Sequence, residues 1–441
     1  MMGSVGDDNA DGHRTPQPNP YPPEGNAGMK ASAGGGSVNG AGRISIDLLR
    51  QAPMPSSSIP AADGTRAMVF AEVLSAGPVS RTDLARRLGV SQSTVTKAVN
   101  PLISMGYLIE AGEKSSGVGR PQRLVQVARE RHLVIGVKIA PRHVTGVLTD
   151  LGAAVLARAR RPLDAKHRPR ATLNAARAVI GELVQAQPRA AGRVLGVGVG
   201  VGGHVDGRRG RVVHSGVMGW DDVDVAAQLT QASGLATVVS NDVDALVIAE
   251  QWFGAGRTAK SFVVVTVGPG IGGGLLLGGQ LYVGKTGLAG ELGHLPLQVD
   301  GPPCSCGNNG CLEALASDDA VLRDIAANTT APPPARIDEA YQMARDGHPA
   351  AVAAFQRMGD ALGRGLAAVC NLLNPEKIVL TGEGAHAFDL FGPACTASLA
   401  AHAFSTAAED CELVIDTADD DMWARGAACL VIQEAVGAAR S

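Results

Sequence analysis

Three thiols and one imidazole are crowded into a short stretch of this chain. His294 precedes Cys304, Cys306 and Cys311 in the spacing His-x9-Cys-x-Cys-x4-Cys, whereas the other four cysteines are scattered. Zinc favours four tetrahedral nitrogen and sulfur ligands, and three cysteines with one histidine form a closed structural set. The alternative is a loop of free thiols beside an unrelated histidine. Because clustered thiols in a reducing compartment usually serve a metal or redox role, we predict a structural zinc ion bound by these four residues.

A second group of polar side chains lies in the first third of the chain. Ser91 can cap a helix that starts at Gln92, and the first turns of this helix carry amide, hydroxyl and ammonium groups. In a helix-turn-helix, the N-terminal residues of the second helix meet base edges in the major groove. An arginine in the extended Gly119-Arg120-Pro121 segment suits the narrow minor groove. The expected DNA-binding residues are Gln92, Ser93, Thr94, Thr96, Lys97, Arg120 and Arg123.

The elements that would carry these side chains, residues 65–127, follow the order of a winged helix-turn-helix. The Ser80-Arg-Thr-Asp83 motif is typical of a helix start, and Gly89-Val90 supplies the turn before the next helix. The remaining expected elements are helices over 66–75 and 92–105 and strands over 106–110 and 123–127, joined by a loop over 111–119.

The charge of this segment also favours DNA binding. Eight Lys and Arg against four Asp and Glu lie between Arg66 and Arg123, an excess of +4 in a chain of net charge −3. Such an excess is expected where a surface meets phosphates. The alternative is a three-helix interaction module whose polar residues only face solvent.

The rest of the chain divides into a polar tail and a long α/β region. Residues 1–62 are rich in Gly, Pro, Ser, Asn and Ala, and we expect them to be a disordered tail. From Leu133 onward, strands and helices alternate in two cycles of βββαβα, which indicates a two-lobed domain over 131–441 with a cleft between the lobes. The expected strands are 133–139, 144–149, 155–158, 194–201, 238–241, 262–267, 274–277, 280–283 and 377–381, and the expected helices are 171–187, 223–233 and 349–373.

The overall composition sets the class of protein. A chain of 441 residues is too long for one compact unit. No apolar run approaches the roughly 20 residues that span a bilayer, and the N-terminus lacks the basic and apolar regions of a signal peptide. We therefore expect a cytoplasmic protein with no membrane partner.

The residues around the zinc ligands resemble a family signature. Gly290-Glu291-Leu292-Gly293-His294, followed by Cys304-x-Cys306-Gly307-x-x-Gly310-Cys311-x-Glu313, is similar to the motif of the ROK family of repressors, open reading frames and sugar kinases. Asn241-Asp242, the loop 268–274 and the strand entry 374–380 also resemble this family. The resemblance covers about residues 131–441. A winged helix-turn-helix ahead of it resembles the repressor branch, which includes xylose, glucose and N-acetylglucosamine regulators.

The resemblance implies a fold and a sugar site. The expected fold class is an N-terminal winged helix-turn-helix followed by a two-lobed α/β domain of the actin-like, hexokinase type. His294 would bind zinc through one ring nitrogen and the sugar through the other. In an active kinase, Asp242 would be the general base that deprotonates the attacking hydroxyl. The implied sugar-binding residues are Gly203, Asn241, Asp242, Glu291, His294 and Glu313.

The side that would hold ATP departs from the kinase pattern. Family kinases carry Asp-x-Gly-Gly-Thr where this chain has Lys138-Ile139-Ala140-Pro141-Arg142, and Gly-Thr-Gly where it has Gly268-Pro269-Gly270. These replacements remove an acid, two glycines, a hydroxyl and two backbone donors. Phosphoryl transfer depends on positioning and on charge compensation by a metal, so we predict no kinase activity and regard Asp242 as a vestigial base. Lys138 and Arg142 could still bind phosphate as cations.

Three functions remain open at this point. The first is a sugar-responsive transcriptional repressor of carbohydrate metabolism whose degenerate kinase domain is the sensor. The second is a bifunctional ATP-dependent sugar kinase with a DNA-binding head, and the third is a regulator whose pocket is inactive and whose signal is a partner protein. The expected partners are a double-stranded DNA operator, a sugar or sugar derivative, and further copies of this chain in a homodimer or homotetramer, because helix-turn-helix proteins usually read two half-sites.

Overall fold

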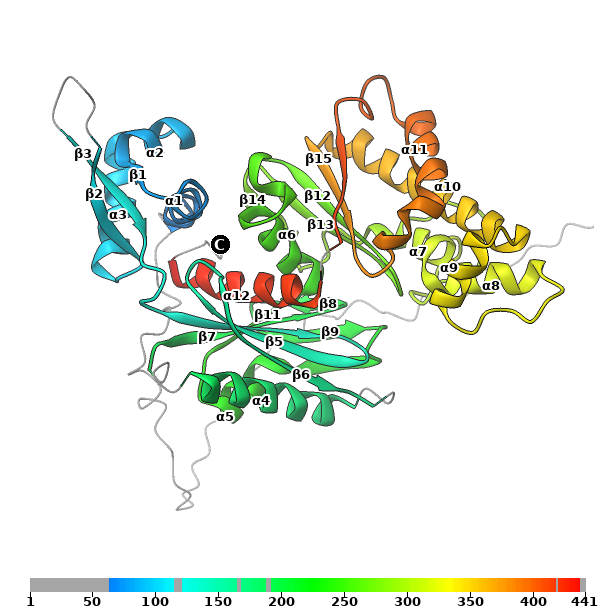
Figure 1. Ribbon diagram of the computed structural model, residues 1–441, viewed down its shortest axis with the longest axis horizontal. Coiled ribbons are helices and arrows are strands. Elements are labelled where there is room, and N and C mark those ends of the chain that lie inside the picture. Colours follow the sequence, from blue (N-terminus) through cyan, green and yellow to red (C-terminus); the bar gives the residue numbers. More distant parts are fainter. Residues whose placement is uncertain (1–62, 115–120, 165–167, 188–191, 418, 437–441) are drawn as a thin grey trace, which may run out of the picture. The chain divides into compact units, whose positions relative to one another are not determined.

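The computed structural model describes residues 63–114, 121–164, 168–187, 192–417 and 419–436, and Figure 1 shows how their helices and strands are arranged. The expected tail, 1–62, and the wing residue Arg120 lie outside the described residues. Within the described ranges, no helix is both long and apolar enough to cross a membrane.

Three helices and a three-stranded sheet form the N-terminal domain. The helices are α1 (Asp63–Ala76), α2 (Arg81–Leu88) and α3 (Gln92–Ser104), and the antiparallel sheet has the order β1 (Val79–Ser80), β3 (Gln122–Val127), β2 (Leu108–Lys114). Ser80 caps α2 as predicted, because its Oγ accepts a hydrogen bond from the N–H of Asp83 at 3.1 Å. Ser91 caps α3 in the same way, with the N–H of Thr94 at 3.1 Å. The predicted winged helix-turn-helix is confirmed.

The first strand of the wing is longer than predicted. The sequence analysis placed 111–119 in a loop, but β2 continues to Lys114. Its pairing with β3 is irregular between Glu110 and Glu113, where Gly112 has a φ of 89°. Such a bulge lets the strand resume pairing after a glycine, which by itself favours a turn.

A mixed five-stranded sheet forms the first lobe of the long domain. In spatial order its strands are β11 (Thr237–Asn241), β7 (Val194–Val201), β4 (Leu133–Ile139), β5 (His143–Asp150) and β6 (Val155–Pro162). Helices α4 (Pro169–Ala186) and α5 (Val225–Ser233) share an apolar core with one face, and α12 (Asp420–Val436) packs on the other. β4 is buried along its whole length because both faces of the sheet are covered.

A small antiparallel sheet precedes α5 and was not fully predicted. Its strands have the order β10 (Trp220–Asp224), β9 (Arg211–Ser215), β8 (His204–Asp206). The helix predicted from Val223 begins at Val225, because Asp224 is its N-cap and accepts a hydrogen bond from the N–H of Ala227.

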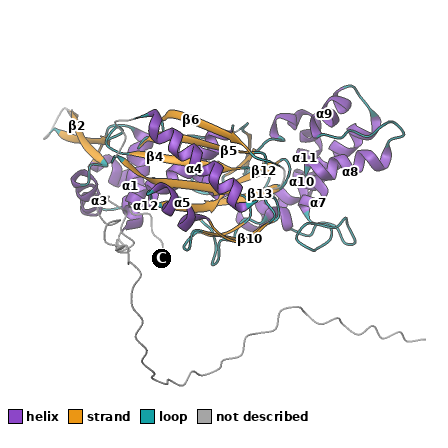
Figure 2. Cartoon of the chain, turned by 90° about the horizontal axis from the view of Figure 1, so that it is seen from below, coloured by secondary structure: helices purple, strands orange, loops and turns teal. Residues whose placement is uncertain are grey.

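A second five-stranded sheet forms the other lobe. Its order is β14 (Gln280–Leu281), β13 (Ile271–Leu277), β12 (Phe262–Val267), β15 (Lys377–Thr381), β16 (Glu412–Ile415). α6 (Asp242–Trp252) packs on one face, and the other face shares a core with a group of helices (Figure 2). This group consists of α7 (Leu312–Ala316), α8 (Asp318–Asn328), α9 (Ile337–Arg345), α10 (Pro349–Leu373) and α11 (Phe388–His402). The predicted two-lobed α/β domain is thus confirmed.

Glycines let α12 approach the first sheet closely. A Cβ added to Gly136 of β4 would lie 1.8 Å from the carbonyl oxygen of Ala424, and one added to Gly198 of β7 would lie 1.8 Å from that of Ala427. α12 also packs on α6, so these two helices lie between the two sheets.

Candidate metal centre, ligand site and DNA-reading face

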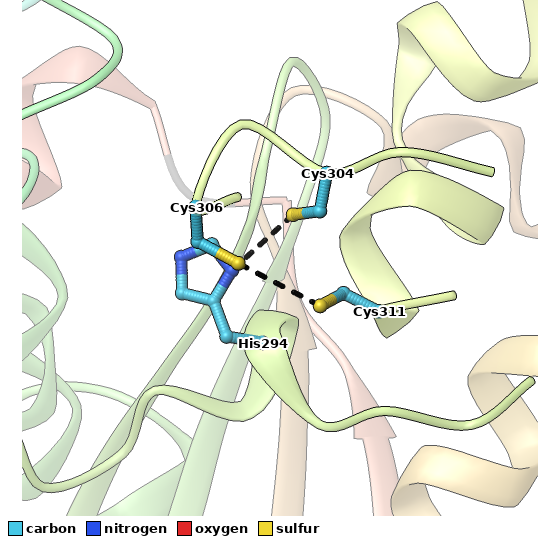
Figure 3. A group of neighbouring side chains, drawn as sticks. All are labelled: His294, Cys304, Cys306 and Cys311. Atoms are coloured by element: carbon cyan, nitrogen blue, oxygen red, sulfur yellow. Dashed lines mark hydrogen bonds between the residues drawn. The ribbon is translucent and has the colours of Figure 1, made fainter. Parts of the chain in front are cut away.

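The four residues predicted to bind a metal come together at one point (Figure 3). His294 ends the 3-10 helix η4 (Leu292–His294), and Cys311 is the N-cap of α7. One ligand atom from each of the four residues lies within 4.8 Å of every other. His294 Nδ1 is 3.5 Å from Cys304 Sγ, and Cys306 Sγ is 3.7 Å from Cys311 Sγ.

These separations fit a tetrahedral metal centre. With metal–sulfur bonds of about 2.3 Å and a metal–nitrogen bond of about 2.0 Å, tetrahedral edges are about 3.8 Å between two sulfurs and about 3.5 Å between sulfur and nitrogen. Two of the six separations, 3.7 and 3.5 Å, agree with these edges, and all six are within 4.8 Å. The residue types and their spacing therefore suit a metal ion bound by nitrogen and sulfur.

The loop that carries the thiols is closed by backbone contacts. Leu297 N–H donates to the carbonyl oxygen of Gly310 at 2.8 Å, and Gly310 N–H donates to that of Pro302 at 2.8 Å. Gly310 has a φ of 67°, and a Cβ there would lie 1.8 Å from the carbonyl oxygen of Gln298. Only glycine fits this position, so the loop depends on it to hold the ligands together.

Glu313 joins the metal loop to the second sheet. Its Oε1 accepts a hydrogen bond from Ser305 Oγ at 3.2 Å, and its Oε2 accepts one from the N–H of Ile271 at 3.2 Å. Ser305 lies between two of the metal-site cysteines, and Ile271 begins β13. The carboxylate that the resemblance assigns to sugar binding thus also fixes the loop against the sheet.

Asn241 and Gly203 are joined by a direct contact. The Asn241 side-chain amide donates to the carbonyl oxygen of Gly203 at 2.9 Å, while its Oδ1 accepts from the N–H of Val243 at 2.7 Å and caps α6. Gly203 has a φ of 116°, and a Cβ there would lie 2.5 Å from the carbonyl oxygen of His214. These contacts fix the start of α6 against the loop before β8.

Asp242 begins α6 and forms an ion pair with Lys138 of β4. The side chains of Lys138 and Asp242 are only 9% and 15% exposed. Lys138 departs from the kinase pattern, and from the sequence it was expected only as a cation that could bind phosphate, not as a partner of Asp242. No local signal connects two residues 104 positions apart.

Glu291 lies among several ionisable groups. Burial raises the pKa of Glu291; the histidines His294 and His204 act against the rise, and the carboxylates Glu313 and Asp242 add to it. His294 Nε2 is 3.9 Å from Glu291 Oε2. The ring therefore directs Nδ1 toward a thiol and Nε2 toward the carboxylate. Three of the implied sugar-binding residues, Asp242, His294 and Glu313, thus lie close enough to the carboxylate of a fourth, Glu291, to affect its pKa.

Asp244 and His204 also belong to this group, and neither was predicted from the sequence. Burial raises the pKa of Asp244 to about 8, and the charges of Asp242 and Glu291 contribute further. His204 Nε2 lies 2.9 Å from the carbonyl oxygen of Thr286 and so connects β8 to the loop after β14. Neither residue belongs to a motif that points to a ligand site.

The predicted DNA-reading residues of α3 lie on its outer side. Thr94 is half-buried, and its hydroxyl shares a hydrogen bond with Ser91 at 2.8 Å. Gln92 Nε2 donates to Thr82 Oγ1 of α2 at 3.1 Å, which links the two helices of the motif. The exposed residues are Gln92, Ser93, Thr96 and Lys97.

In the wing, Arg123 is exposed and pairs with Glu110 at 3.1 Å. An exposed pair of this kind contributes little to stability, so the guanidinium can exchange its partner for a phosphate at small cost.

Comparison with known proteins assigns both domains. Residues 134–434 match the model of the ROK family. The chain belongs to the ROK family. Ahead of the ROK domain, residues 70–116 match the model described as iron dependent repressor, N-terminal DNA binding domain.

Both ROK regulators and ROK kinases are similar to this chain. The xylose repressor of Bacillus subtilis (strain 168) is 27% identical over 313 residues, which cover 71% of this chain and 80% of the repressor. The solved structure of a ROK family transcriptional regulator, a homolog of the E. coli MLC protein, has a TM-score of 0.71 and 25% identity and covers 85% of this chain and 97% of that one. A ROK glucokinase from Streptomyces griseus, in complex with glucose and AMPPNP, has a TM-score of 0.60 and 26% identity and covers 68% of this chain and 98% of that one.

Carboxylates border the loop 268–270 of the ROK domain. A Cβ added to Gly268 would lie 3.0 Å from Glu383 Oε2, and one added to Gly270 would lie 2.9 Å from Glu313 Oε2. Asp318 N–H donates to the carbonyl oxygen of Gly268 at 2.9 Å. Burial raises the pKa of Asp318 to about 7, and Glu383 contributes to the rise. This loop thus faces negative groups of its own chain.

A cavity of about 600 Å³ lies away from these groups, in the DNA-binding domain and the segment after it. Its lining includes Val73, Leu74, Ile109, Val127 and Arg131. None of the predicted ligand or metal residues lines it.

Proposed function

We propose that this chain is a sugar-responsive DNA-binding repressor of carbohydrate metabolism, and that its ROK domain binds a sugar without phosphorylating it. The observation that carries the proposal is the presence of two features in one chain. One is a helix-turn-helix whose second helix has an exposed polar face, and the other is the group of polar side chains around Glu291. The regulator match, which covers more of the chain than the ROK domain alone, supports it. A protein that reads operators in this way acts in the cytoplasm and binds two half-sites as a homodimer or homotetramer.

Charge argues against the kinase alternative. ATP brings several negative phosphates, which need cations and backbone donors around them. Here Glu383 and Glu313 border the loop 268–270, and Pro269 has no N–H to donate. Lys138, one of the two cations available to bind a phosphate, already pairs with Asp242. We therefore infer that the domain keeps sugar recognition and lacks phosphoryl transfer.

The metal in the proposed repressor is zinc with a structural role. Three thiolates and one imidazole at tetrahedral separations suit zinc and leave no ligand position open for catalysis. When bound, zinc would fix the loop that carries Ser305, and through Ser305 it would fix Glu313. His294 would be oriented by the metal at Nδ1 and would present Nε2 beside Glu291.

One helix joins the sugar site to the DNA-binding domain, which supports a coupling between them. α6 begins beside Asn241 and ends at Trp252, whose ring lies 6.1 Å from the ring of Phe70 in α1. Just beyond α6, Arg257 donates to the carbonyl oxygen of Ser75 at 3.1 Å. A structural change at the start of α6 can therefore be transmitted to the DNA-binding domain through these contacts.

The test is a DNA-binding assay with sugars. Genomic fragments retained by the full chain supply an operator, and fluorescence anisotropy then measures affinity with D-xylose, D-glucose or N-acetyl-D-glucosamine present. We expect one of these sugars to change the affinity by roughly 5- to 150-fold, the usual range of allosteric coupling. Failure to retain any DNA refutes the repressor, and retention without an effect of any sugar favours a partner protein as the signal. Turnover in a coupled ATP-magnesium assay that Asp242→Asn abolishes would establish the kinase instead.

A further inference from the structure

Lys138 is a buried ammonium in the first lobe. In β4 it lies between Thr145 of β5 and Gly200 of β7. Its Nζ contacts Asp242 Oδ2 and lies 3.6 Å from the centroid of the Trp423 ring. Because a buried charge is unfavourable unless it is paired, the position of Lys138 depends on this carboxylate and this ring.

Gly200 lets the carboxylate reach the ammonium. A Cβ added to Gly200 would lie 3.4 Å from Asp242 Cα, so the start of α6 lies directly over β7. Trp423, from the first turns of α12, closes the other side and is itself buried. Three elements far apart in the sequence thus build one enclosed ion pair.

The carboxylate of Asp242 is held at both oxygens. Oδ1 accepts a hydrogen bond from the N–H of Val243 at 3.0 Å, and Oδ2 faces Lys138. Asp242 is also the first residue of α6, where the helix dipole favours a negative group. These contacts fix the position of both carboxylate oxygens of Asp242.

We propose that Lys138 is a positioning residue of the sugar site, which holds the carboxylate of Asp242 in place as a hydrogen-bond acceptor for a sugar hydroxyl. The inference rests on the proposed sugar-sensing function and adds the residue that fixes its acceptor.

A second lysine provides a matched control. Lys377 of β15 also has a largely buried side chain, 12% exposed, and pairs with Glu412 at 2.9 Å. Lys377 lies in the second sheet and Glu412 is 65% exposed, so this pair touches none of the residues gathered around Glu291. Lys377→Met therefore removes a similar side chain without changing the sugar site.

The experiment is a double-mutant cycle on the full chain. Calorimetric titrations with D-xylose, D-glucose and N-acetyl-D-glucosamine compare the wild type with Lys138→Met, Asp242→Asn, the double variant and Lys377→Met. Lys138→Met should weaken binding about tenfold or more, because it leaves a buried carboxylate without its counter-ion. In the Asp242→Asn background the same change should have little further effect, since Lys138 acts through that carboxylate. Lys377→Met should bind like the wild type.

Two results would overturn the proposal. The first is an unchanged sugar affinity in Lys138→Met. The second is an equal loss of sugar affinity from Lys138→Met in the wild-type and Asp242→Asn backgrounds, which would show that Lys138 has only a structural role. If no sugar binds the wild type, the sugar-sensing function fails, and the role of Lys138 in the sugar site is refuted with it. If the wild type binds a sugar and Lys138→Met binds it equally well, only the role of Lys138 fails.

Discussion

Asp244 should make the stability of the ROK domain depend on pH. Burial raises the pKa of this carboxyl from 3.8 to about 8, and the neighbouring charges of Asp242 and Glu291 add to the rise. Between these two values the folded chain keeps a proton that the unfolded chain releases. The contribution of Asp244 to the free energy of unfolding is therefore fully present below pH about 4. It falls by about 1.4 kcal/mol per pH unit as the pH rises to about 8.

Asp244→Asn replaces the protonated carboxyl by a neutral group of the same shape and removes this dependence. Relative to the wild type, the variant should gain about 2.5 kcal/mol of unfolding free energy between pH 5 and pH 7. Urea unfolding followed through tryptophan fluorescence measures the difference, because Trp220, Trp252 and Trp423 are all buried in the ROK domain. Asp346→Asn, at an exposed carboxyl in the second lobe, is the control and should follow the wild type. An Asp244→Asn curve parallel to the wild type from pH 5 to 7 would show that Asp244 is ionised in the folded chain, and the reasoning would be refuted.

Four further outcomes test the other sites. Elemental analysis should find one zinc per chain in the wild type and none in Cys306→Ser, which should also melt at a lower temperature. Lys97→Ala should weaken operator binding in gel shifts, and Arg120→Ala should cost about 1–3 kcal/mol if it enters the minor groove. Glu291→Ala should abolish the sugar response in anisotropy while the free protein still binds DNA; a response at wild-type sugar concentrations would place the pocket elsewhere. Gly136→Ala should lower the urea midpoint, because its Cβ would lie 1.8 Å from the Ala424 carbonyl oxygen.

Local signals in the sequence predicted the elements well. The strand Val194–Val201 and the helix Pro349–Leu373 occur with the predicted bounds. The bounds of the helix follow from its end residues. Pro349 suits the first turn of a helix, and Asn374 ends the helix in the left-handed conformation with a φ of 42°. The metal ligands were predictable for the same reason, because four residues of the right type lie close together in the chain.

Contacts between distant segments could not be predicted in this way. Lys138 and Asp242 come from β4 and α6, and neither the period of the strand nor the cap of the helix indicates a partner. Glu383 lies beyond β15 and reaches Gly268 only because β12 and β15 pair in parallel, so that their carboxyl ends share one sheet edge. The chain has the family's fold, and side chains from such distant places set the charge around Asp242 and the loop 268–270.

Trp252 should carry the sugar signal to the DNA-binding domain. It ends the helix that Asn241 caps, it packs against Phe70, and its buried Nε1 has no hydrogen-bond partner among the described residues. A buried donor without a partner is unfavourable, so this contact is easier to change than an ordinary core contact. Trp252→Phe should therefore leave sugar affinity near the wild-type value and reduce the ratio of DNA affinities measured with and without sugar. An unchanged ratio would mean that the signal bypasses α6, and a loss of sugar binding would mean that Trp252 serves the sugar site itself.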